Sequence, residues 1–166
     1  MPVIDMQGAI VADPWVEGDP ADRAATEPLI LPLADLTELT AGGIEDARPV
    51  GVRVPPGAGI DPLLAVLDRL QFIVIEFPSF RDGRGFTHAT TLRNRHGFMG
   101  ELRASGHVLP DHFAALRQCG FTTIETPANH PPQCWRDQMP AEENGGPLLK
   151  RLLAVRSAPA VGKAAA

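Results

Sequence analysis

Four short runs of β-branched and aromatic residues, evenly spaced along the middle of the chain, constrain the fold most. They begin at residues 50, 72, 101 and 121, and residues of these types favour pleated, partly buried backbone. Each interval between consecutive runs is long enough for a helix. Because parallel strands need a long, right-handed crossover connection, this spacing predicts parallel βα units.

Local signals define the predicted elements. Helices are expected from Asp61, where a proline follows the capping residue, from Thr87, and from Pro110 or Asp111. Residues 29–31 could add a fifth strand. The chain is therefore predicted to be an α/β protein: repeated βα units form a four- to five-stranded, mostly parallel sheet with helices packed on it. A doubly wound sheet and a partial barrel both fit this pattern.

The 166 residues suffice for one ordinary domain. Three segments are predicted from the changes in composition. Residues 1–28 are an irregular acidic arm, residues 29–126 the α/β domain, and residues 127–166 a partly disordered extension rich in proline and glycine.

Charge and composition exclude several classes of protein. The net charge is -5, and residues 1–47 hold ten acids and one base, so broad nucleic-acid binding is not expected. The longest apolar run, Phe72 to Ile75, is far too short to span a membrane. Two cysteines cannot make a disulfide framework, and the first residues lack the basic region of a secretory signal. A cytoplasmic location is expected.

The loop after the second run is the best candidate for a binding site. Arginines, two glycines and a helix N-terminus come together there, and such groups can hold a small anion. The candidate ligand-binding residues are Arg81, Asp82, Gly83, Arg84, Gly85 and Arg93. The alternative is an ordinary Asp-Gly turn, in which Asp82 pairs with Arg84 or Arg93.

The third run and the loop after it supply further candidates. Glu101 and Arg103 alternate on one face of a strand, so they complete the predicted anion site if that strand is central. On an edge strand they would simply be solvated. His107 and Asp111 are candidates for an acid or base, although a loop histidine is more often a hydrogen-bonding surface group.

Cofactor motifs are weak. Gly83-Arg84-Gly85 lacks the third glycine of a dinucleotide fingerprint, because position 88 is histidine. The five histidines show no metal-ligand spacing, and two cysteines are too few for an iron–sulfur cluster. No metal is expected, the residues support neither zinc nor a Rossmann nicotinamide site, and the cofactor remains unknown.

Several motifs resemble the signature of a bacterial family of unknown function. The resemblance covers roughly residues 29–126 and rests on residues 77–87, Leu92-Arg93, Gly97-Phe98, residues 100–104, residues 106–109 and Cys119-Gly120-Phe121. This chain departs from the family pattern at Phe86-Thr87, where Tyr-Ser is usual, at His107, where aspartate is usual, and at His112, where glutamine is usual.

Members of that family are labelled as oxidoreductases of sulfite reduction, because their genes lie beside that of sulfite reductase. The resemblance implies an accessory role in assimilatory sulfite reduction. Its arginines would bind a small oxyanion or a nucleotide-like ligand, and sulfite reductase is the implied partner. The alternative is a non-catalytic interaction module that docks on a sulfite reductase-type partner through its acidic arm. The residues alone leave open whether the chain is an enzyme.

Overall fold

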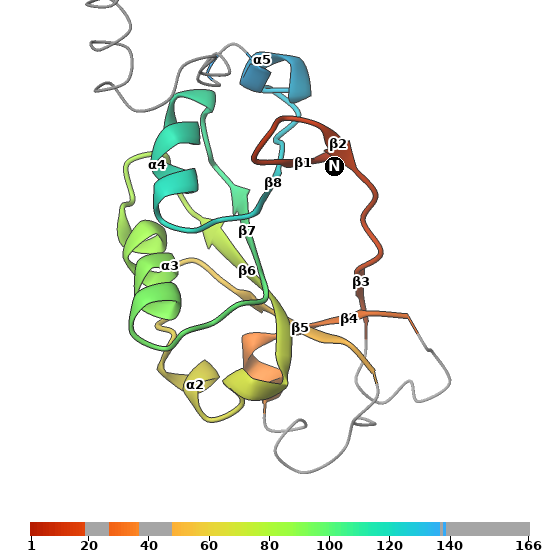
Figure 1. Ribbon diagram of the computed structural model, residues 1–166, viewed down its shortest axis with the longest axis vertical. Helices are drawn as coiled ribbons and strands as arrows, with labels where there is room; N and C mark the ends of the chain where they lie inside the picture. The colour runs from red at the N-terminus through yellow and green to blue at the C-terminus, as the bar shows by residue number, and fades with distance from the viewer. Residues whose placement is uncertain (19–26, 37–47, 137, 139–166) are drawn as a thin grey trace, which may run out of the picture.

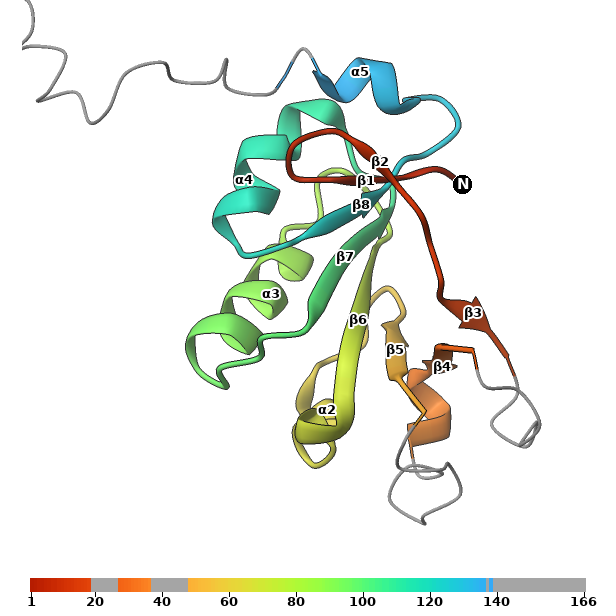
Figure 2. The same cartoon turned by 45° about the vertical axis from the view of Figure 1, so that its right-hand side comes forward.

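A computed structural model describes residues 1–18, 27–36, 48–136 and 138. These residues form one curled, mixed sheet of eight strands in the order β2-β1-β8-β7-β6-β5-β4-β3 (Figures 1 and 2). The strands are β1 (Val3–Asp5), β2 (Ile10–Val11), β3 (Val16–Glu17), β4 (Leu29–Pro32), β5 (Val50–Val54), β6 (Leu70–Phe77), β7 (Glu101–Gly106) and β8 (Thr123–Glu125).

The predicted fold class is wrong. The sheet has eight strands rather than four or five, and it is mixed: neighbours from β3 to β8 are parallel, whereas β1 is antiparallel to both β8 and β2. The extra strands β1, β2 and β3 are only two or three residues long. Strands this short show no alternating pattern, and distant pairing partners stabilise them.

Helices are short and few in the described residues. They are α2 (Asp61–Leu64), α3 (Arg84–Asn94), α4 (Phe113–Gln118) and α5 (Pro132–Arg136), with single turns η1 (Leu33–Asp35), η2 (Leu67–Arg69) and η3 (Pro110–His112). In both views α2, α3 and α4 lie on the same side of the sheet (Figures 1 and 2). We call this side the helix-covered face and the opposite side the helix-free face.

The main core lies on the helix-covered face. Alternate residues of the strands point into it, so Val52, Ile73 and Leu102 are completely buried there. A smaller cluster of Ile30, Phe72 and Val74 lies apart from this core, with Trp15 packed against it. The rings of Trp15 and Phe72 are stacked with their centroids 4.5 Å apart. Residues of the arm therefore cover part of the helix-free face.

The described part of the arm is not irregular, because residues 3–17 contain β1, β2 and β3. Beyond β8, α5 is anchored by Trp135, which is fully buried. Most of the predicted C-terminal extension lies outside the described residues. The limits of the three predicted segments stay a prediction. No helix in the described part of the chain is long and apolar enough to cross a membrane.

Candidate functional site at the carboxyl ends of the strands

A cavity of about 510 Å³ lies where β6 and β7 end and where the chain leaves β8. Its polar lining consists of Glu76, His107, Asn129 and His130, and Phe80 forms part of the wall. The carboxyl ends of neighbouring parallel strands lie along one edge, which is the usual place for a ligand in α/β proteins. We call this the carboxyl-end cavity.

The backbone at the end of β7 places His107 in the cavity. Gly106 has a positive φ of 84°, and a Cβ at this position would lie 2.5 Å from the carbonyl oxygen of Phe77. Only glycine fits this close crossing without strain. The next residue, His107, then donates its backbone N–H to the Phe77 carbonyl at 2.9 Å, so the histidine is fixed over the end of β6.

The opposite rim depends on α5. The Trp135 Nε1–H donates to the His130 carbonyl at 2.9 Å, and the His130 N–H donates to the Pro127 carbonyl at 2.9 Å. These bonds hold His130 beside the cavity. Sequence reasoning missed Glu76, Asn129 and His130. The available signal for Asn129 and His130 was Trp135, which follows a proline-rich segment and, as a tryptophan, is expected to pack against the rest of the chain.

Arg81 in the β6–α3 loop and Arg84 at the start of α3 have different partners. Arg84 donates to the Asp82 carboxylate through Nε, at 3.0 and 3.1 Å, and through Nη2. Hydrogen bonds from Arg84 lower the pKa of Asp82 from 3.8 to about 2, and the same contact raises the pKa of Arg84. The Arg81 guanidinium lies 5.3 Å from the centroid of the Phe80 ring. No described residue forms an ion pair with the exposed Arg81, whose neighbour Phe80 lines the carboxyl-end cavity.

Gly83 and Gly85 have different surroundings. A Cβ on Gly85 would lie 2.5 Å from the Phe77 ring, so this glycine lets α3 pack closely on β6. Gly83 has open space around it and an ordinary φ of -78°. Nearby, His88 is half-buried in α3, and the pKa of its imidazole is lowered by burial and, to a smaller extent, by the charge of Arg84.

Arg93 lies far from this loop. It sits in the last turn of α3, which runs from the carboxyl edge of the sheet to the amino edge. Its side chain donates to the carbonyls of Gly120 at 2.9 Å, Gly100 at 2.8 Å and Phe98. Burial lowers the pKa of the Arg93 guanidinium. Arg93 therefore ties two loops together at the amino edge, the α3–β7 loop and the α4–β8 loop, and it does not join the cavity.

Glu101 and Arg103 do lie on one face of β7, and it is the helix-free face. Arg103 is only 3% exposed. Its two terminal nitrogens donate to Asp13 at 2.7 and 2.9 Å, and Nη2 also donates to Glu101 at 3.0 Å. The Arg103 guanidinium also stacks over Phe72, 4.5 Å from the ring centroid. Its donors are thus occupied within the chain.

The eight predicted ligand-binding residues therefore fall into three places. Arg81, Asp82 and Gly83 of the β6–α3 loop lie at the carboxyl edge together with Arg84 and Gly85 of the first turn of α3. Arg93 lies at the amino edge, and Glu101 and Arg103 lie on the helix-free face. Of the two candidate acids or bases, His107 lines the cavity, whereas Asp111 is exposed in η3. Within the described ranges no group of three or more His, Cys, Asp or Glu side chains could hold a metal ion.

The fold and the cavity define a protein with a curled, mixed sheet of eight strands and few helices, which carries a polar-lined pocket along the carboxyl edge of its parallel strands. A family model described as "Bacterial protein of unknown function (DUF934)" matches residues 51–143, more than half of the chain, so the chain belongs to this family. The match includes the whole lining of the carboxyl-end cavity and omits β1 to β4. Searches among curated proteins and among solved structures gave no match.

Proposed function

We propose that this chain is an accessory protein of assimilatory sulfite reduction that binds a small oxyanion or a nucleotide-like ligand in the carboxyl-end cavity. The observation that carries the binding part is a cavity of about 510 Å³ lined by His107, His130 and Phe80. Phe80 is followed by Arg81, which forms no ion pair with a described residue. The volume is within the range of about 300–1,000 Å³ that is usual for ligand pockets. The sulfur pathway rests on the motifs described above.

The lining favours a ligand that carries more than a bare anion. The imidazoles of His107 and His130 supply hydrogen-bond donors on opposite rims, and Arg81, which follows the lining residue Phe80, carries a positive charge. The Phe80 ring is 48% exposed and offers an apolar surface on which a planar group can stack. Glu76 and Asn129 would accept hydrogen bonds from hydroxyl or amino groups. Because the Glu76 carboxylate would repel a naked dianion, this set suits a nucleotide ester of an oxyanion best.

The alternative is a docking module whose acidic arm contacts a basic partner. Two acids of the arm are already used inside the chain, since Asp13 binds Arg103 and Glu17 binds Arg53. This internal pairing leaves less of the arm's charge for a partner, and it favours the ligand-binding proposal.

A thermal-shift screen of the full chain tests the proposal. The ligands are sulfite, sulfate, phosphate, adenylyl sulfate, nicotinamide cofactors and flavins. A ligand at one hundred times its dissociation constant stabilises the fold by about 2.7 kcal/mol. We expect adenylyl sulfate to raise the melting temperature of the wild type and of Arg95→Gln, which alters an exposed arginine at the amino edge, but not of Arg81→Gln. No shift with any ligand overturns the binding proposal and favours the docking module.

A further inference from the structure

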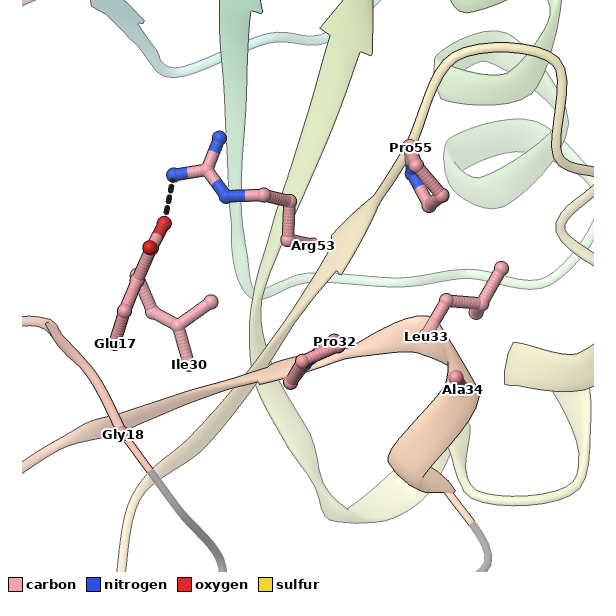
Figure 3. A pocket seen from close by; sticks show the side chains of 8 residues that line it. All are labelled: Glu17, Gly18, Ile30, Pro32, Leu33, Ala34, Arg53 and Pro55. Atoms are coloured by element: carbon pink, nitrogen blue, oxygen red, sulfur yellow. Dashed lines mark ion pairs between the residues drawn. The ribbon is translucent and has the colours of Figure 1, made fainter.

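We propose a second ligand site on this chain, in a separate cavity of about 240 Å³ at the carboxyl ends of β3, β4 and β5. It would take a small molecule with an apolar body and a carboxylate head. Figure 3 shows the cavity, with the Arg53 guanidinium and Glu17 on one wall. It shares no lining residue with the carboxyl-end cavity, so this site is independent of the proposed function.

The body of the cavity is apolar. Ile30 and Pro32 of β4 form one side, and Leu33 and Pro55 close it where the chain leaves β4 and β5 (Figure 3). These side chains offer carbon surface and no donor. An apolar ring or short alkyl chain would be removed from water here, and burial of apolar surface is favourable.

Arg53 supplies the only cation of the wall formed by the described residues, and its hydrogen bonds are incomplete. Nη2 pairs with a Glu17 oxygen at 2.5 Å and approaches Glu125 at 3.9 Å, while Nη1 donates to the Ser105 hydroxyl at 3.4 Å. The Nε–H is buried and has no partner among the described residues. An unpaired buried donor costs stability, so a ligand that satisfies it gains affinity.

The geometry of the guanidinium points to a carboxylate. Nε and Nη2 form one edge of the planar fork, and a carboxylate that meets this edge with both oxygens makes two parallel hydrogen bonds. Glu17 reaches the edge at Nη2 alone. A ligand carboxylate that contacts both nitrogens would therefore bind Arg53 better than Glu17 does.

Breaking the ion pair between Glu17 and Arg53 costs little free energy. It belongs to the short edge strand β3, and its side chain is 64% exposed, against 26% for Arg53. Its carboxylate can turn into water, where it is well solvated. One carboxylate then replaces another at Arg53, so the net charge of the site does not change. Glu125 stays in place because the Ser105 hydroxyl donates to it at 2.7 Å.

A titration of the ¹⁵N-labelled full chain, followed by NMR, tests the site. The probes are benzoate and its neutral counterpart benzamide, which has nearly the same shape. We expect benzoate to shift the backbone amides of Ile30 and Leu33 and the Nε–H of Arg53, and benzamide to bind at least tenfold more weakly. Equal shifts with the two probes, or no shift at these positions with benzoate, would overturn the proposal.

Two charge-removing variants separate the mechanism from a general effect of charge. Glu17→Gln removes the competing carboxylate, and we expect it to tighten benzoate binding about fivefold, the size of an exposed ion pair. Asp68→Asn removes an exposed acid away from the cavity and should leave the affinity unchanged. If both variants change the affinity equally, or neither does, Glu17 is not the competitor and the proposal fails.

Arg53→Lys keeps the positive charge but loses the planar guanidinium, and it should weaken benzoate binding. If this variant does not fold, the comparison of Glu17→Gln with Asp68→Asn still tests the proposal.

Discussion

The two faces of the sheet are made by the same strands, but the side chains buried on them differ in polarity. On the helix-covered face β6 presents Ile73 and Ile75 and β7 presents Leu102, all of them buried against short helices. On the helix-free face β6 is still apolar, with Phe72 and Val74, but β7 presents Arg103 and Ser105. Both β7 residues are only 3% exposed. One face is thus an apolar core, and the other combines a small apolar cluster with buried charge.

The difference shows what can stand in for a helical layer. Trp15 stacks on Phe72, and Asp13, two residues earlier, binds the Arg103 guanidinium with both oxygens. A few residues of the N-terminal arm therefore supply both the apolar cover and the counter-charge. A buried arginine is tolerated only when its donors are satisfied, and here the arm satisfies them.

The largest expected effect is on the helix-covered face. Phe113→Ala in α4 removes a completely buried ring from the core, and we expect the free energy of unfolding to fall by about 3–5 kcal/mol. Urea unfolding measures it. The control is Met99→Ala, a side chain that is 90% exposed, which should change stability by less than about 0.5 kcal/mol. Similar losses in the two variants would mean that the helices do not carry the main core.

The next largest effect tests the buried charge. Arg103→Met leaves Asp13 and Glu101 without their counter-ion, and we expect a loss of about 2–3 kcal/mol, because these acids are partly exposed and can be rehydrated. Asp13→Asn in the Arg103→Met background should then cost much less than in the wild type. A double-mutant cycle measures this coupling. Additive effects would show that the Asp13–Arg103 contact does not hold the arm.

A smaller effect is expected for the apolar cover. Trp15→Ala removes the stack on Phe72, and since Trp15 is only half-buried we expect a loss of about 1–2 kcal/mol. Trp15→Phe keeps an aromatic ring there and should lose less than half as much in the same urea experiment. If both substitutions are neutral, Phe72 is covered adequately without the arm.

The central strands were predictable because their patterns are strong. β5 is rich in β-branched residues and lies between prolines, and β6 is a mostly apolar run that ends before Pro78. The alternation of Glu101, Leu102 and Arg103 put the two charges on one face. The arm strands could not be found this way. Val16 and Glu17 form a strand only because β4 lies beside them, and no local signal encodes that pairing.

The candidate site was predictable in part, for the same reason. His107 follows a strand directly, and the edge of a parallel sheet then places it at the cavity. His130 reaches the cavity only through the anchoring of Trp135 in the extension, and the unsatisfied Nε of Arg53 depends on where β3 lies. Residues placed by long-range packing are invisible to periodicity and motif.

The smallest effect belongs to the exposed ion pair of the β6–α3 loop, which is the reference for the buried one. The pKa of the Asp82 carboxyl is lowered from 3.8 to about 2, mainly by its hydrogen bonds from Arg84. A carboxyl whose pKa is lower in the folded state stabilises the fold above its unfolded pKa and loses that contribution as the pH falls through the folded value. The stability difference between wild type and Asp82→Asn should therefore be constant above about pH 5, shrink as the pH falls through 3.8, and vanish only below about pH 2. A ¹³C NMR titration of Asp82 checks the cause directly: in Arg84→Ala its midpoint should return toward 3.8.

Added salt should reduce the stability difference between wild type and Asp82→Asn more than it reduces the Asp13–Arg103 coupling, because exposed charges are screened more than buried ones. Equal sensitivity to salt would mean that Arg103 is not shielded by the arm.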